Sequence, residues 1–120
     1  MSSRAAHQYF TDILDAIQHA EEIVAGKSFN EYQQDRTLKR AVERLLMIVT
    51  EAAIKLSDDD KKLCAYTEWR SMRDLGNRIR HAYFALDDQQ IWLTVQDDFP
   101  PLKTAVENTL REHFPEAPLL

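Results

Sequence analysis

Hydrophobic residues recur every three or four positions along most of the chain, and this spacing predicts helices. No stretch alternates hydrophobic and polar residues for long enough to predict a strand. Ser2 or Ser3 is the expected N-cap of the first helix, and Gly26 is expected to end it. The hydrophobic stripe of this helix consists of Phe10, Ile13, Leu14, Ile17, Ala20 and Val24.

Two further helices are predicted in the next part of the chain. Ser28 and Glu31 have the spacing of a capping box, which predicts a short helix over residues 29–34. A second long helix is expected to start near Asp35 or Thr37. Its expected buried face consists of Leu38, Val42, Leu45, Val49, Ala52, Ala53 and Leu56.

Capping signals also mark the next two helices. Ser57 and Asp60 predict a short helical turn that extends through Cys64. Thr67 is expected to cap a third long helix over residues 68–84. The expected core face of that helix consists of Met72, Leu75, Ile79, Ala82 and Leu86.

Two more helices are expected to complete the domain. Asp87 or Asp88 is the expected cap of the first, whose inward residues are Ile91, Trp92 and Val95. Pro100 and Pro101 interrupt this helix, and Pro101 suits the first turn of a last helix that extends to about His113. Four or five antiparallel helices joined by short loops predict a single all-α bundle over residues 1–120.

The composition agrees with a globular domain, because 44% of the residues are hydrophobic and 29% are charged. Cys64 is the only cysteine, which excludes an internal disulfide and a cysteine-based zinc site. The histidines are not spaced like metal ligands, so no metal or cofactor is expected. The first 25 residues fit neither a signal peptide nor a membrane span, so we expect a cytoplasmic protein.

The charge of the chain is distributed unevenly. A net charge of −5 is unusual for a protein that binds nucleic acid over its whole surface. The third long helix nevertheless carries four arginines: Arg70, Arg73, Arg78 and Arg80. Opposite its core face, this helix presents Arg70, Arg73, Asn77, Arg80, His81 and Phe84. Gly76 and Tyr83 are expected at the border between the two faces.

A row of cations, an amide and an imidazole is suited to handling a phosphodiester. Arginine binds phosphate in a forked geometry, and histidine transfers protons near neutral pH. A solvated basic face paired with acids is the commoner explanation, so the row alone predicts only an anionic ligand. Arg36, Arg40 and Arg44 are interpreted as a solvated face of this kind. Glu51 is expected to pair with an arginine across the bundle or across a dimer.

The segment RDLGNRIRHAYF, residues 73–84, resembles the signature of HEPN domains, and specifically of HepT-like toxins. That signature runs arginine, a polar residue, three further residues, histidine, any residue and tyrosine. Asn77, His81 and Tyr83 match it, whereas Gly76 stands where the arginine is expected. TEAAIKLS, EWRSMRDLGN and LDDQQIWLTVQDDFPPL resemble other segments of the family, so the resemblance covers most of the chain.

The resemblance implies a two-fold homodimer and a metal-independent endoribonuclease. Such enzymes leave a 2′,3′-cyclic phosphate and a 5′-hydroxyl. On this chain His81 would be the acid–base group, and Arg73 or Arg80 would replace the missing arginine. Asn77 would orient the histidine or the phosphate.

The resemblance also implies partners and regulation. RNA would be the substrate, and Arg70 and Arg78 would bind it. In the toxin–antitoxin systems of this type, an MntA-like nucleotidyltransferase is the antitoxin and adds AMP to the signature tyrosine, which here would be Tyr83. The added negative charge would repel RNA from the basic face.

The missing arginine leaves a second function open. Without it, the chain would be a non-catalytic binding module that docks a nucleotidyltransferase or a nucleotide. Arg73 and Arg80 lie one turn before and one turn after Gly76, and the glycine is expected to leave open space between them. Close approach of another helix, such as one from a partner subunit, would justify a mid-helix glycine that costs about 1 kcal/mol.

Overall fold

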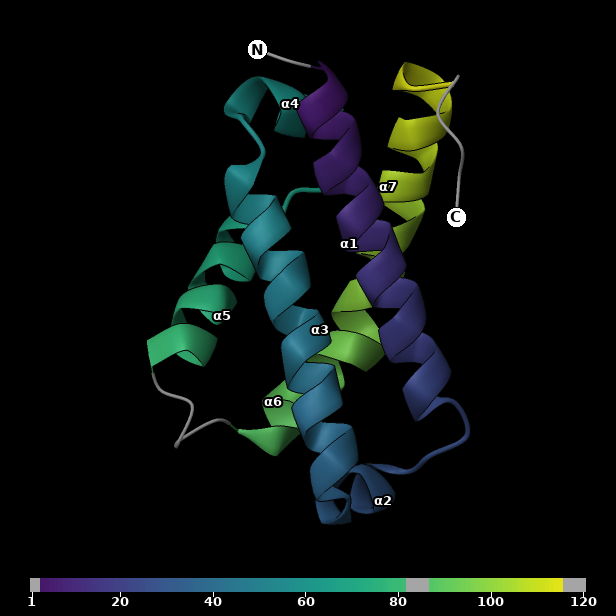
Figure 1. Cartoon of the computed structure of the whole chain (residues 1–120), viewed down its shortest axis with the longest axis vertical. Coiled ribbons are helices and arrows are strands. Elements are labelled where there is room, and N and C mark those ends of the chain that lie inside the picture. The colour runs from purple at the N-terminus through teal and green to yellow at the C-terminus, as the bar shows by residue number, and fades with distance from the viewer. Residues whose placement is uncertain (1–2, 82–86, 116–120) are drawn as a thin grey trace.

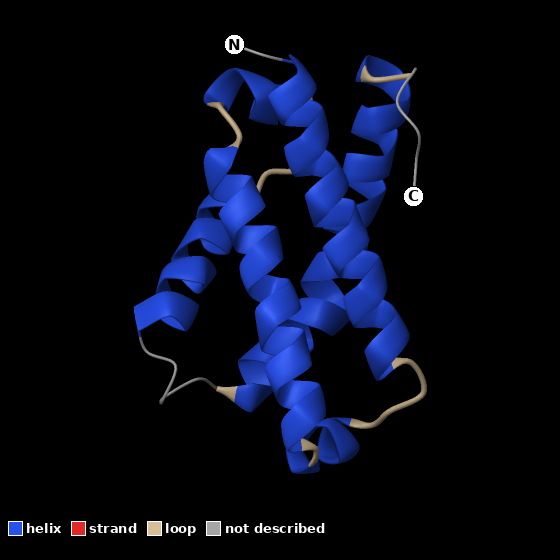
Figure 2. Cartoon of the chain, viewed as in Figure 1, coloured by secondary structure: helices blue, strands red, loops and turns tan. Residues whose placement is uncertain are grey.

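The computed structural model describes residues 3–81 and 87–115, and every regular element in those ranges is helical (Figures 1 and 2). Four long helices form the body of the molecule: α1 (Ser3–Val24), α3 (Arg36–Lys55), α5 (Trp69–His81) and α7 (Phe99–His113). Each runs antiparallel to the preceding one (Figure 1). The predicted all-α antiparallel bundle is confirmed.

Shorter helices join the long ones. They are α2 (Phe29–Gln34), α4 (Asp58–Lys62) and α6 (Asp88–Leu93). The last of these continues through a π-helical segment, Thr94–Asp98, directly into α7. This wide turn immediately precedes Pro100 and Pro101, which have no backbone N–H for an ordinary helical bond. The prolines therefore change the helical geometry without breaking the helical path, whereas the sequence predicted an interruption.

Local capping explains why most helix boundaries were predictable. The Ser28 hydroxyl accepts from the Glu31 amide at 3.1 Å, and the Glu31 carboxylate accepts from the Ser28 amide at 2.8 Å. Asp35 caps α3 by accepting from the Leu38 amide at 3.0 Å. Gly26 ends the first helical segment with a φ of 75°, a conformation that glycine adopts without strain.

The boundaries around α4 and α5 differ slightly from the prediction. Ser57 caps α4 as expected, but the helix ends at Lys62, before Cys64. The first backbone bond of α5 joins the Met72 amide to the Glu68 carbonyl at 3.2 Å, so the helix begins after Glu68. The Thr67 hydroxyl donates instead to the Glu68 carboxylate at 3.3 Å. Among the described residues, no α5 backbone amide donates to the Thr67 hydroxyl, so the expected cap is not observed.

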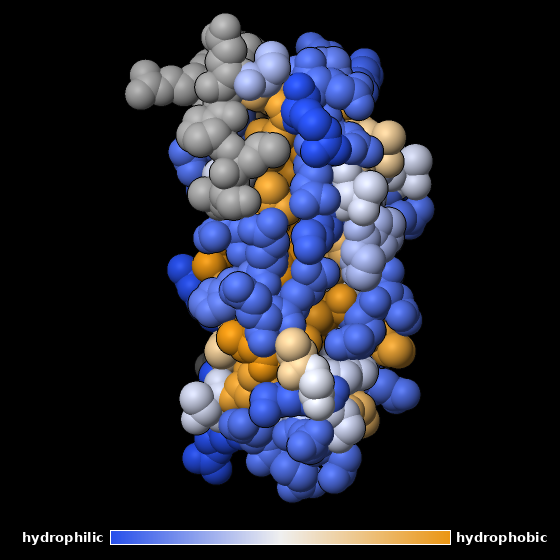
Figure 3. Space-filling model, turned by 90° about the vertical axis from the view of Figure 1, so that its right-hand side faces the viewer, coloured by the Kyte–Doolittle hydropathy of each residue, from blue (hydrophilic) through white to orange (hydrophobic). Residues whose placement is uncertain are grey.

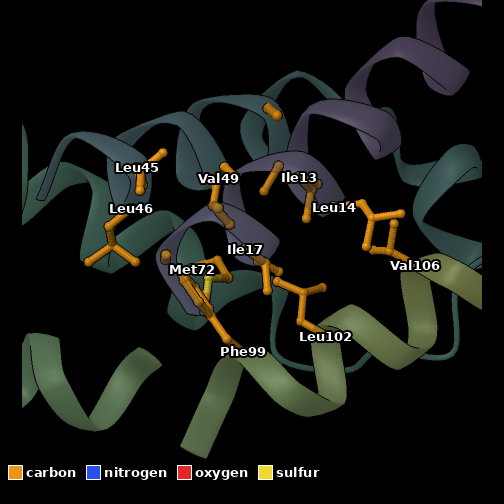
Figure 4. Close-up of a cluster of buried hydrophobic side chains, with 14 of the residues drawn as sticks. Ile13, Leu14, Ile17, Leu45, Leu46, Val49, Met72, Phe99, Leu102 and Val106 are labelled. Carbon is orange, nitrogen blue, oxygen red and sulfur yellow. The ribbon is translucent and has the colours of Figure 1, made fainter. Parts of the chain in front are cut away.

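The core lies where the four long helices meet (Figure 4). Its fully or almost fully buried side chains include Ile13, Ile17, Leu46, Val49, Met72, Phe99, Leu102 and Val106. Each large side chain buried in this way contributes about 1.5–3 kcal/mol of transfer free energy. The inward faces predicted from the hydrophobic spacing are confirmed for the described residues except Trp92, which is only half-buried against the core. Ala82 and Leu86 lie outside the described residues.

Two ion pairs connect helices that are distant in the sequence. Lys103 on α7 donates to Glu21 on α1 at 2.9 Å, and Lys39 on α3 donates to Asp88 on α6 at 3.2 Å.

The side of the molecule that carries α7 is mostly hydrophilic, with apolar side chains visible in a narrow stripe along its length (Figure 3). Among the described helices, none combines the length and the apolar character needed to cross a membrane.

Candidate functional site

Helix α5 approaches α3 closely at Gly76, which is buried. A Cβ added to this glycine would lie 2.8 Å from both Cβ and Oγ1 of Thr50 on α3. The expected open space at Gly76 is therefore wrong, because Thr50 fills it. Close approach of a helix does explain the glycine, and that helix belongs to the same chain.

The opposite side of α5 carries the polar row predicted from the sequence. Arg70, Arg73, Asn77, Arg80 and His81 are all exposed, whereas Met72, Leu75 and Ile79 are buried. The division of α5 into a core face and a polar face is thus confirmed over residues 69–81. Tyr83 and Phe84, which the sequence placed on this helix, lie outside the described residues.

Three members of the row form a group at the C-terminal end of α5. The Arg80 guanidinium donates to the side-chain oxygen of Asn77 at 2.7 Å. His81 directly follows Arg80 and is the last residue of the helix. Because the Asn77 oxygen is engaged, its amide hydrogens are the part of the side chain that can meet an anion. The end of α5 therefore presents a guanidinium, an amide and an imidazole to solvent within about one helical turn.

The remaining arginines of the stretch are separated from this group. Arg78 donates to the Gln90 side chain on α6 at 3.2 Å, which directs it toward a different helix. Arg73 lies about 12 Å before His81 along the axis of α5, at a rise of about 1.5 Å per residue. Together with Arg70 it lines a cavity beside α4. The predicted site residues are thus divided into an end group, a cavity pair and one arginine bound to α6.

The basic face of α3 pairs with acids, as the sequence indicated. Arg40 contacts Glu43 at 3.0 Å; the Arg40 side chain is exposed, whereas that of Glu43 is mostly buried. Arg44 lies 3.9 Å from Glu51 on the same helix. Glu51 therefore pairs with an arginine of its own helix, and the expected pairing across the bundle is wrong. Pairing across a dimer stays a prediction. Within residues 3–81 and 87–115, no group of three His, Cys, Asp or Glu side chains is arranged to hold a metal ion.

The cavity beside α4 was missed by sequence reasoning. It measures about 640 Å³ and lies between the end of α3, helix α4 and the start of α5. Lys61 and Lys62 line it together with Arg70 and Arg73. A weak signal existed in the sequence, because two lysines precede the arginine-rich helix across a short loop. That signal could not show that the loop brings the two sets of cations together.

The chain is similar over most of its length to a known protein family and to proteins of two other organisms. The family model described as Ribonuclease HepT-like matches residues 13–109. A protein of Thermococcus cleftensis named "Probable ribonuclease HepT" is 35% identical over 104 residues, which cover 87% of this chain and 94% of that protein. A "Putative RNase" of Methanocaldococcus jannaschii is 30% identical over 107 residues, covering 89% and 98%. No solved structure matches the chain significantly.

Proposed function

The chain belongs to the HepT-like ribonuclease family, and on that basis we propose that it is a metal-independent endoribonuclease. The observation that carries the proposal is the exposed group formed by Asn77, Arg80 and His81 at the end of α5. This group combines a proton-transfer residue with donors for a phosphate. Cleavage is proposed to leave a 2′,3′-cyclic phosphate and a 5′-hydroxyl.

The proposed reaction needs only proton transfer and charge stabilisation. The RNA 2′-oxygen attacks the adjacent phosphorus, and the bond from phosphorus to the 5′-oxygen breaks. A base takes the proton of the 2′-hydroxyl, and an acid gives a proton to the departing 5′-oxygen. The His81 imidazole serves one of these roles. The Arg80 guanidinium and the Asn77 amide donate to the phosphate oxygens, whose negative charge is redistributed in the transition state.

A second copy of the chain would supply the other proton-transfer group, so we propose a two-fold homodimer. The polar face of α5 is exposed along its length, which leaves it accessible to a partner and to RNA. In a two-fold contact each copy presents the same surface, so two His81 side chains would face one cleft. We expect sedimentation equilibrium to give twice the mass of the chain at micromolar concentration. A pure monomer under those conditions would contradict the proposal, since a stable contact of this kind buries a sizeable area.

We further propose that the protein is the toxin of a toxin–antitoxin pair. Its antitoxin would be an MntA-like nucleotidyltransferase that transfers AMP to Tyr83. Tyr83 follows His81 by two residues in the sequence, so an AMP group there would bring negative charge near the proposed cleft. Mass spectrometry after incubation with a cognate nucleotidyltransferase and ATP tests this. Modification of a different residue would contradict the assignment of Tyr83.

The cleavage proposal is tested by the ends that the protein produces. Purified protein is incubated with single-stranded RNA in excess EDTA, and the fragments are analysed by mass spectrometry. We expect internal cleavage with 2′,3′-cyclic phosphate ends, because the reaction uses the neighbouring 2′-hydroxyl. An oligonucleotide with 2′-deoxy sugars should remain intact. Cleavage that requires a divalent ion, or that leaves 5′-phosphates, would contradict the mechanism.

The missing arginine is expected to be replaced by Arg80 or Arg73. Arg80 lies in the same group as His81, whereas Arg73 is farther along the helix. Replacing the arginine that takes this role, by Arg80→Ala or by Arg73→Ala, is expected to lower RNA cleavage by more than about tenfold. Arg40→Ala is the matched control, since Arg40 is exposed on α3 and pairs with Glu43. Equal losses in all three variants would indicate general electrostatic binding of RNA.

A non-catalytic binding module is the second candidate. The observation that favours it is Gly76, which is packed against Thr50 at the position where the family signature has an arginine. Such a module would dock a nucleotidyltransferase or a nucleotide through the same exposed face of α5. The EDTA assay distinguishes the two candidates, since the module would leave RNA intact while still binding it.

A further inference from the structure

The cavity beside α4 differs from the rest of this acidic protein in its charge. Its lining includes four cationic side chains, Lys61, Lys62, Arg70 and Arg73, and one carboxylate, Asp58. These charged side chains come from helix α4 and the start of α5, and Ala53 and Ile54 at the end of α3 complete the lining. The three segments lie at the same end of the molecule (Figure 1). The net charge of the whole chain is −5, so this local excess of positive charge marks an anion-binding surface.

Most of these cations have no acidic partner within the described chain. Lys62 lies 3.8 Å from Asp59, and that pair is solvent-exposed. Within residues 3–81 and 87–115, neither Arg70 nor Arg73 forms an ion pair. An exposed ion pair such as the one at Lys62 is weak and easily exchanged for another anion. The guanidinium groups are therefore available to bind phosphate in their forked geometry.

Trp69 adds an aromatic wall to the same cavity. Tyr66 packs edge-on against its indole at 4.9 Å between ring centroids, and this contact holds the ring in place. Burial raises the pKa of Tyr66 to about 12, so its phenol is neutral and adds no negative charge there. The Trp69 Nε1 is buried and has no acceptor among the described residues.

The Lys61 ammonium lies 5.9 Å from the centroid of the Trp69 ring. A nucleobase that entered the cavity would compete with this ammonium for the ring. Stacking of a base on an aromatic side chain is stronger than an exposed cation–π contact. The displaced ammonium would remain beside the ligand, where it can meet a phosphate. Lys61 therefore suits a ligand that brings a base and a phosphate together.

We propose that this cavity binds one nucleotide of single-stranded RNA, with its phosphate on the cations and its base against Trp69. The identity of the ligand as RNA rests on the proposed ribonuclease function. A volume of about 640 Å³ is within the usual range for sites that hold a small molecule or one residue of a polymer. Double-stranded RNA does not fit this chemistry, because its bases are already stacked.

The cavity is separate from the proposed cleavage group. Arg73, at its edge, is about 12 Å from His81 along α5. The nucleotide in the cavity is therefore one that flanks the cut, and the phosphate that reacts lies farther along the helix. This arrangement extends the RNA path along α5 from its first turn to its last. Loss of Lys61 and Lys62, which take no part in the proposed cleavage, should consequently weaken RNA binding and raise KM, with little change in kcat.

Charge reversal at α4 tests the phosphate half of the proposal. Binding is measured by fluorescence anisotropy with a labelled oligouridylate in EDTA, using the full chain with His81→Ala to prevent cleavage. Adding Lys61→Glu and Lys62→Glu is expected to raise the Kd for RNA by at least about tenfold. The slope of log K against log salt concentration should also become shallower, by the equivalent of about one or two phosphate contacts. The control adds Lys27→Glu and Arg111→Glu, two exposed residues outside the cavity, and changes the net charge equally. Equal weakening by both pairs overturns the proposal.

Tryptophan emission tests the base half. The chain has two tryptophans, so Trp92→Phe in the same His81→Ala background leaves Trp69 as the only emitter. Titration with oligouridylate is expected to quench that emission. Unchanged emission at saturating RNA overturns stacking on Trp69. Quenching by AMP but not by the oligonucleotide assigns the cavity to a free nucleotide and overturns the RNA assignment.

Cleavage assays on the native chain and on the α4 charge-reversal variant distinguish a failure of the cavity proposal from a failure of the proposed ribonuclease function. If the native chain cleaves RNA while the α4 reversal leaves both binding and KM like the control, the cavity site is wrong and the ribonuclease remains. If the native chain does not cleave RNA but the α4 reversal alone weakens RNA binding, the cavity site stands without the cleavage activity. A raised KM with a kcat close to native supports both proposals together.

Discussion

His81→Ala is expected to lower the rate of RNA cleavage by about 10²-fold or more, the usual loss when a general acid or base is removed. His81 is exposed at the last position of α5, so its side chain supports little of the core. The thermal midpoint of unfolding should therefore change by no more than about 2 °C. A large loss of activity with an intact fold is the result that identifies a proton-transfer residue.

The rate is measured at saturating RNA in EDTA, and the fold is checked by circular dichroism. His113→Ala is the matched control, since His113 is also exposed and also ends a long helix. It should retain full activity. Native-like cleavage by His81→Ala would remove this residue from the mechanism. Equal losses in both histidine variants would indicate damage to the protein preparation or to its assembly.

Gly76→Arg is expected to destabilise the protein by about 2–3 kcal/mol, as overpacked buried sites commonly do. The new Cβ would lie 2.8 Å from the Cβ of Thr50, which rotation of the threonine side chain cannot move. Thr50 is fully buried, and its hydroxyl donates to the Met47 carbonyl at 3.1 Å. Helices α3 and α5 would have to separate, so restoring the signature arginine is not expected to raise activity.

Thermal unfolding should place the midpoint of Gly76→Arg roughly 10 °C below that of the native protein. Gly76→Ala, which adds only the colliding Cβ, should also lower the midpoint although alanine favours helix formation by about 1 kcal/mol over glycine. Ser71→Arg adds the same side chain at an exposed position of α5 and serves as the control. A midpoint of Gly76→Ala above the native value would show that α5 and α3 are not held this closely.

The elements that the sequence predicted best are those specified by neighbouring residues. The helix over residues 29–34 has the expected bounds because Ser28 and Glu31 form both bonds of their capping box within one turn. The polar and core faces of α5 were likewise predictable, because helical geometry alone sorts residues around the axis. The π-helical segment before Pro100 was not, since a missing N–H excludes one bond without specifying its replacement.

The features that sequence reasoning missed depend on which helices meet. On an isolated helix, Gly76 leaves space because it has no side chain. Only the packing of α5 against α3 shows that Thr50 fills this space. The cavity depends in the same way on Lys61 and Arg70 meeting across the loop between α4 and α5. The hydrogen bond between Asn77 and Arg80 could have been predicted from the sequence, because the two residues are three positions apart on one helix.

Helix α5 packs chiefly on α3, whereas α1 packs on both α3 and α7. An outer helix held mainly from one side opens at a lower free energy than a central one. The backbone amides of α5 should therefore exchange their hydrogens with solvent sooner than those in the middle of α1. All the cations proposed to meet RNA, apart from those on α4, are carried by this outer helix. The surface proposed to bind RNA can therefore change its tilt through this opening, while the central helices keep their protection from exchange.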